Sequence, residues 1–127
     1  MFIDFGDYTI EITDVKIIPA ENNSFEKAPT IAFWYTTTNI SRDDLSPMVA
    51  WILSMEAYQD NNPDYLKELE VASLPDQAHL HTQDAKIKKG GSLENSAAYI
   101  LDDLETPVLL KSSEFSPIDY AQEFPVK

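Results

Sequence analysis

The sequence contains no cysteine, so it can form no disulfide framework and no Cys-ligated zinc site, and it has no thiol nucleophile. Only three glycines are present, which excludes a P-loop and a dinucleotide-binding fingerprint. No apolar run reaches the roughly 18 residues that would span a membrane. The first ten residues, MFIDFGDYTI, lack the basic start and long apolar core of a signal peptide.

Positive charge is also scarce. Nine Lys and Arg residues stand against 22 Asp and Glu residues, which gives a net charge of −13. Such a surface repels phosphate backbones and anionic lipid, so we expect no nucleic-acid binding and no insertion into a membrane. The simplest interpretation is that the charge keeps the protein soluble, although a basic partner or a hard cation is compatible with it.

Apolar and aromatic residues are plentiful. Hydrophobic residues make up 43% of the 127, and six Phe, six Tyr and two Trp are among them. This length corresponds to one domain, and this composition supplies a core. We therefore expect a single folded domain over residues 1–127.

Two segments near the N-terminus have the pattern of β-strands. In YTIEITDVKII, residues 8–18, apolar and polar residues alternate, and the apolar phase shifts near Thr13-Asp14, which predicts a bulge. TIAFWYTTTN, residues 30–39, is rich in β-branched and aromatic residues. Trp34 falls on the face opposite the other aromatic residues and needs its own cover or partner. The polar segment 20–29 between them is expected to be a loop.

The stretch MVAWILSMEAYQDN, residues 48–61, is compatible with two structures. Its apolar residues form one stripe at helical spacing from Met48 to Tyr58, behind a potential cap at Ser46-Pro47. At period two they also line one face of a strand. Residues 64–73 are likewise compatible with either a short helix or a strand. Residues 74–86 have an irregular pattern.

Further short strands are predicted at residues 92–101, 108–113 and 118–124, with a turn at KKGG, residues 88–91. About seven or eight short strands separated by turns are typical of an all-β, antiparallel two-sheet sandwich. The expected core comprises Ile10, Ile12, Ile31, Phe33, Tyr35, Trp51, Leu53, Leu93, Ala97, Tyr99, Val108 and Leu110.

Four segments in order carry a family resemblance: YTIEITDVKI, PTIAFWYTTTNIS, AWILSMEAYQDN and IKKGGSLENSAAYILDDLETPVLL. Together they resemble immunoglobulin-like domains of unknown function in secreted proteins and lipoproteins of Gram-positive bacteria, related to the mycobacterial secreted-antigen sandwich. The shared marks are Thr38-Asn39 with Ser41, Tyr58-Gln59, Lys89-Gly90, Ala98-Tyr99 with Leu101 and Asp103, and Pro107-Val108. The segment DNNPDYLKELE, residues 60–70, is longer than its counterpart in the family.

The resemblance implies an immunoglobulin-like fold and a place outside the cell or anchored at the cell envelope, with the signal sequence already removed. In the family an aromatic-Gln pair ends a strand, so it also implies that residues 48–60 are extended. The implied role is a non-enzymatic interaction or accessory domain with an unknown protein or envelope partner. No cofactor is expected.

His79 and His81 form the first weak candidate for a metal site. On a strand, residues two apart share a face, so the two imidazoles could converge on one ion. Zinc normally takes three or four protein ligands, and no spacing rule selects Asp76 or Asp84 as the others. The simpler interpretation is two exposed histidines on a polar loop.

Acidic turns form the second weak candidate. Asp60 and Asp64, in the DNNPD segment, offer oxygen ligands of the kind that calcium takes, without the EF-hand spacing. Asp43-Asp44 and Asp102-Asp103 are similar. Because Asp and Asn in turns usually bind backbone amides, a structural role is the simpler interpretation.

Three further functions were compared with the sequence: an enzyme, a binding domain with an aromatic surface, and a structural subunit. No GxSxG elbow is present, and no carboxylate pair stands out among 22 acidic residues, so no catalytic residues are predicted. Trp34, Tyr35, Trp51 and Tyr58 either form a binding surface or pack in the core. A structural subunit that pairs with a neighbour through the N-terminal segment or another strand edge is a further alternative.

Overall fold

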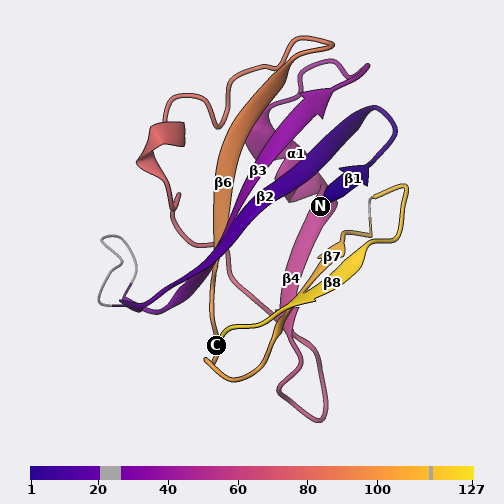
Figure 1. The fold of residues 1–127 in the computed structure, drawn as a ribbon. Coiled ribbons are helices and arrows are strands. Elements are labelled where there is room, and N and C mark those ends of the chain that lie inside the picture. The colour runs from indigo at the N-terminus through magenta and orange to yellow at the C-terminus, as the bar shows by residue number, and fades with distance from the viewer. Residues whose placement is uncertain (21–26, 115) are drawn as a thin grey trace.

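The computed structural model describes residues 1–20, 27–114 and 116–127, which form two four-stranded antiparallel sheets (Figure 1). One sheet has the strand order β1-β2-β3-β6 and the other the order β5-β4-β7-β8. The predicted all-β sandwich is confirmed, with eight strands. The elements are β1 (Phe2–Asp4), β2 (Tyr8–Ile18), β3 (Thr30–Asn39), α1 (Pro47–Ser54), β4 (Met55–Gln59), β5 (Lys67–Glu68), η2 (Gln77–His79), β6 (Ser92–Ile100), β7 (Val108–Ser112) and β8 (Ala121–Phe124).

Strands β2 and β3 have the bounds that the sequence predicts and pair along their length. Their register shifts between Ile12 and Asp14, where the change of apolar phase predicts a bulge. Most of the predicted loop 20–29 lies outside the described residues. At the N-terminus, β1 pairs with β2 of the same chain, so pairing of this segment with a neighbouring molecule stays a prediction.

The expectation that residues 48–60 are wholly extended is wrong for their first half. Pro47–Ser54 form the helix α1, and the strand β4 begins only at Met55. The resemblance places the end of this strand correctly at Gln59 but implies too early a start.

Local chemistry explains the helix. The Ser46 side chain caps it by accepting a hydrogen bond from the Val49 N–H at 3.2 Å, and Pro47 occupies the first turn, where its missing N–H costs nothing. The buried residues Pro47, Ala50, Trp51 and Ser54 recur at helical spacing. The helix therefore turns one stripe toward the sandwich core.

Aromatic rings fill the centre of the core. Phe33 is fully buried, and its ring centroid lies 5.6 Å from that of Trp51, 6.2 Å from Tyr99 and 5.2 Å from Phe124. The Tyr35 ring stacks on Trp51 with centroids 4.5 Å apart. The helix thus supplies the indole that joins the two sheets. Of the predicted core residues, all are buried except three that are half-buried: Leu53, Leu93 and Ala97.

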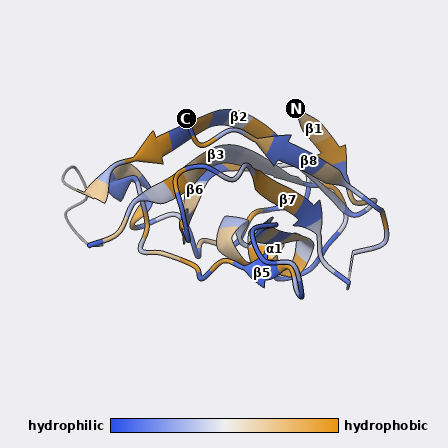
Figure 2. Cartoon of the chain, turned by 90° about the horizontal axis from the view of Figure 1, so that it is seen from below, coloured by the Kyte–Doolittle hydropathy of each residue, from blue (hydrophilic) through white to orange (hydrophobic). Residues whose placement is uncertain are grey.

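The two sides of the sandwich are closed by different contacts. On one side the sheets meet where the Tyr120 hydroxyl donates to Met1 Sδ at 2.9 Å, beside β1 and β8. On the other side, α1 packs against β6, and it lies in the lower layer beside β7, beneath β3 and β6 (Figure 2). Backbone hydrogen bonds from Ala72 N–H to Ala98 O and from Ile100 N–H to Glu70 O cover the free edge of β6. This second side carries the cavity described next.

Candidate functional site

A cavity of about 320 Å³ opens between α1, β4, β6 and the segment that follows β5. We call it the α1–β6 pocket. Most of its lining side chains are apolar, and the aliphatic and sulfur-containing walls include Met48, Ile52, Met55, Leu69, Val71 and Leu74. Its volume falls within the range of small-molecule sites, about 300–1,000 Å³.

The rim of this pocket exposes large apolar side chains. Ile52, on the outer side of α1, is 60% exposed, and Val71, next to the edge of β6, is 70% exposed. Figure 2 shows that part of α1 consists of hydrophobic residues. Both side chains line a hollow whose walls are mostly apolar, and exposed apolar side chains at a hollow are a feature of binding sites.

One wall of the pocket contains a chain of polar groups. The Tyr35 hydroxyl donates to the Pro47 carbonyl at 2.9 Å, and Asn95 Nδ2 donates to the Tyr35 oxygen at 2.8 Å. Asn95 is 1% exposed, and its Oδ1 has no hydrogen-bond partner among the residues that the structure describes. Asn95, which is among the residues that line the pocket, therefore has a carbonyl oxygen that is closed to solvent and has no hydrogen-bond partner among the described residues.

Two acidic residues, Glu56 and Glu68, are among those that line the pocket, but Glu56 Oε1 accepts from the Tyr58 hydroxyl at 3.1 Å and Glu68 is exposed. At the same pocket, Trp51 Nε1 donates to the Tyr99 hydroxyl at 2.8 Å. Burial raises the pKa of Tyr99, and the negative charges of both glutamates raise it further. The Tyr99 hydroxyl is thus neutral at physiological pH and feels a negative potential.

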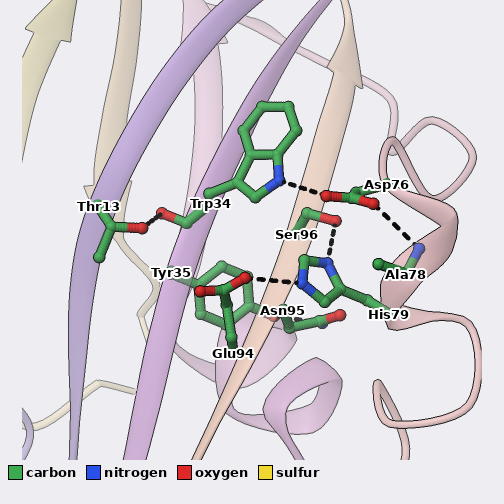
Figure 3. A network of polar contacts seen from close by, with 9 residues as sticks. All are labelled: Thr13, Trp34, Tyr35, Asp76, Ala78, His79, Glu94, Asn95 and Ser96. Atoms are coloured by element: carbon green, nitrogen blue, oxygen red, sulfur yellow. Dashed lines mark hydrogen bonds and ion pairs between the residues drawn. The ribbon is translucent and has the colours of Figure 1, made fainter.

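The two histidines do not share a face, because they do not lie on a strand. His79 ends the short turn η2 and is buried, whereas His81 is exposed in the turn that follows. The expectation of two exposed histidines is therefore wrong for His79. Asp76 at the start of η2 accepts from Trp34 Nε1 at 2.9 Å, which supplies the partner that Trp34 needs (Figure 3).

His79 fastens η2 to β6 through two hydrogen bonds. Its Nδ1 lies 2.9 Å from Ser96 Oγ and its Nε2 lies 3.1 Å from Glu94 Oε1 (Figure 3). A serine, an imidazole and a carboxylate in sequence have the order of a hydrolytic triad. Ser96 is only 2% exposed, however, so its hydroxyl is closed to a substrate, and we interpret the contacts as structural.

The acidic turn at residues 60–64 also has structural contacts. Asp64 N–H donates to Asn62 Oδ1 at 2.9 Å, and Asn61 Nδ2 donates at 2.7 Å to Oδ2 of both Asp102 and Asp103. The Asn61 amide, followed by the N–H groups of the next turn, holds the pKa of Asp103 well below its usual range. The Asp102 and Asp103 carboxylates thus accept hydrogen bonds from amide groups, as Asp side chains in turns usually do.

The weak metal candidates are therefore not brought together. Asp60 and Asp64 lie on an exposed turn, and His79 is bonded to β6. Over residues 1–20, 27–114 and 116–127, no group of three or more His, Asp or Glu side chains is arranged to hold a metal ion. Metal binding by this chain stays a prediction.

The four aromatic residues proposed as a binding surface do not lie together on an exposed face. Tyr35 and Trp51 are buried, whereas Trp34 is half-buried with Lys16 Nζ 5.0 Å from its ring centroid. Tyr58 is half-buried beside Lys111, and burial together with a hydrogen bond to Glu56 raises its pKa to about 12. Sequence reasoning missed the α1–β6 pocket because its walls come from four separate segments.

Two of the marks of the family resemblance are buried amides that hold loops. Gln59 Oε1 accepts from the Asp102 N–H at 2.8 Å, and Gln59 Nε2 donates to the Asp103 and Thr106 carbonyls at 3.1 and 2.8 Å. Asn39 Nδ2 donates at 2.8 Å to the carbonyl of Ile87 in the same manner. Each amide fixes a turn to the end of a strand.

Comparisons with known proteins agree with this architecture. The model of a family described as "Domain of unknown function (DUF5067)" matches residues 1–114. The solved structure of a Staphylococcus aureus protein described as "a putative lipoprotein" superposes with a TM-score of 0.77 at 20% sequence identity, covering 98% of this chain and 90% of that one. At that identity the likeness establishes the fold. No curated protein matches the sequence significantly.

Within the part of the chain that the structure describes, no helix is both long and apolar enough to cross a membrane.

Proposed function

We propose a function from the premise that this chain belongs to the family described as "Domain of unknown function (DUF5067)", whose model spans residues 1–114. The proposed function is that of a non-catalytic binding domain of the bacterial cell envelope. Its binding site is the α1–β6 pocket. One observation carries this proposal: a hollow of about 320 Å³ with apolar walls is bordered by the exposed side chains of Ile52 and Val71.

We also infer that the sandwich is immunoglobulin-like. The strands β2, β3 and β6 would correspond to A, B and E of that fold, and β5, β4, β7 and β8 to C′, C, F and G. The helix α1 would then occupy the connection from B to C. In this assignment the pocket lies beside strand E, where residues 69–72 take the place of a regular strand D.

Binding of a neutral apolar probe tests the pocket. We expect N-phenyl-1-naphthylamine to bind with enhanced fluorescence, and the variant Ile52→Ser/Val71→Ser to bind it at least about fivefold more weakly. The physical reason is that each truncation removes apolar contact worth on the order of 0.5–1 kcal/mol.

Ile40→Ser is the matched control, because Ile40 is 49% exposed and does not line the pocket. It should bind the probe as the unmodified protein does. Absence of probe binding to the unmodified protein, or equal loss in the control, would contradict the proposed binding site.

The proposed location rests on the fold shared with the Staphylococcus aureus protein. We expect the protein to be outside the cytoplasmic membrane in the organism that encodes it. Protease added to intact cells should then degrade it, while a cytosolic marker protein survives until lysis. Protection equal to that of the marker would contradict the envelope location.

A further inference from the structure

We propose that the free edge of β1 binds an extended segment of a partner protein. The segment pairs with Phe2 and Asp4 as an additional antiparallel strand. It carries Lys or Arg opposite Asp4 and an aromatic or β-branched residue opposite Phe2. Neither Phe2 nor Asp4 lines the α1–β6 pocket, so this inference does not depend on the proposed function.

The backbone of β1 has hydrogen-bonding groups that face away from its sheet. The Met1 carbonyl accepts from the Ile12 N–H at 2.8 Å, and the antiparallel register of β1 with β2 continues from this bond. In such a ladder only every second residue exchanges hydrogen bonds with a given neighbour. Ile3 therefore bonds to β2, whereas the N–H and C=O groups of Phe2 and Asp4 point outward. No backbone hydrogen bond joins these four groups to another described residue.

The other strand edges are less suited to an added strand. Residues 70–72 cover the edge of β6, β5 has only the two residues Lys67–Glu68, and β8 is followed directly by Pro125. In contrast, β1 lies at the outer side of its sheet beyond β2 (Figure 1). It contains neither Pro nor Lys, the residues that commonly protect an exposed edge.

The side chains of β1 specify the composition of the added strand. Phe2 is 65% exposed and Asp4 is also exposed, and they point to the same face because they are two residues apart. Glu11, opposite Phe2 on β2, adds a second carboxylate, and residues 2–4 and 9–11 contain no Lys or Arg. Cross-strand pairs of opposite charge, and pairs of aromatic with aromatic or β-branched residues, stabilise a sheet. In an antiparallel segment the order is therefore Lys or Arg, any residue, then an aromatic or β-branched residue.

A second copy of this chain does not supply such a segment. Each copy has a net charge of −13, so two copies repel each other. The sequence of β1 is Phe-Ile-Asp, which offers no basic residue to Asp4 of a second copy. The charge of the chain thus favours a basic segment of a different protein.

The peptide acetyl-Thr-Lys-Thr-Tyr-Thr-amide tests this inference by NMR titration of the protein at low salt. We expect the amide signals of Phe2 and Asp4 to shift more than that of Ile3, whose N–H faces β2. Replacing Lys in the peptide by Glu should weaken binding about two- to fivefold. Equal affinity for the two peptides would overturn the basic character of the partner.

Backbone pairing is tested by N-methylation of the peptide, which removes one donor without changing a side chain. The N–H of Tyr faces Phe2, whereas the N–H of the central Thr faces solvent. N-methylation of Tyr should therefore weaken binding about fivefold more than N-methylation of the central Thr. Equal loss at the two positions would overturn strand pairing at this edge.

Two variants of the protein locate the site. Phe2→Ala and Asp4→Asn should each weaken binding of the Lys peptide about two- to fivefold. Asp60→Asn is the matched control for the charge, because Asp60 is an exposed carboxylate in the turn after β4, and it should bind as the unmodified protein does. Unchanged affinity in either β1 variant would overturn the assigned contacts. Shifts of the Phe2 and Asp4 amides on concentrating the protein without peptide would identify a second copy as the occupant and overturn the proposed partner.

Discussion

Replacing Phe33 by alanine is expected to lower the free energy of unfolding by about 3–5 kcal/mol. Phe33 is fully buried where both sheets and α1 meet, and its ring contacts Trp51, Tyr99 and Phe124. Truncation removes apolar burial and leaves a cavity that the surrounding rings cannot fill without losing their own edge and stacking contacts. Urea unfolding followed by circular dichroism measures the loss.

Phe2→Ala is the matched control for this variant. Phe2 is an aromatic residue that is 65% exposed on β1, so its truncation should change the free energy of unfolding by less than about 0.5 kcal/mol. A loss below about 1 kcal/mol for Phe33→Ala would show that the rings do not form the centre of the core.

Replacing Gln59 by methionine is expected to cost about 2–4 kcal/mol, although the volume of the side chain is nearly kept. The reason is that Gln59 is fully buried and pairs with the Asp102 N–H and with the Asp103 and Thr106 carbonyls. Without the Gln59 amide, these buried backbone groups have no partner, and each unpaired group costs about 1–3 kcal/mol of stability. Partial access of water to this turn reduces the total cost.

The effect of Gln59→Met should also be local. Hydrogen exchange of the Asp102 and Asp103 amides should accelerate more than that of amides in β3. Gln77→Met, at an exposed position in η2, should leave both stability and exchange of this turn unchanged. Unfolding energy equal to that of the unmodified protein would mean that the turn is held by other contacts.

The sequence predicted the strands that are regular over many residues. The bounds of β2 and β3 and the bulge near Thr13 follow from alternation along the chain, because successive side chains of a strand point to opposite faces. The helix α1 was missed although its cap at Ser46 and the proline at position 47 were visible. Its residues also fit a strand, and both the neighbouring strands and the family resemblance favour that structure over the helix that the local cap predicts.

The candidate site was much less predictable. The spacing of His79 and His81 indicated a shared face, yet the turn η2 buries the first and exposes the second. Nothing in the local pattern marked Asn95 as a pocket residue, since an Asn among alternating residues of β6 is usually a surface position.

The sequence alone therefore determined that residues 8–18 and 30–39 are extended, that no cysteine or glycine-rich chemistry is available, and that the surface is acidic. Each of these depends on composition or on a repeat of two residues, which a single stretch of chain contains. The tertiary structure decided where the sheets leave the α1–β6 pocket open and that the buried Asn95 Oδ1 has no hydrogen-bond partner in the described part of the chain. These features depend on distances between segments far apart in the chain, and such distances are fixed only when the side chains of both sheets and α1 pack together.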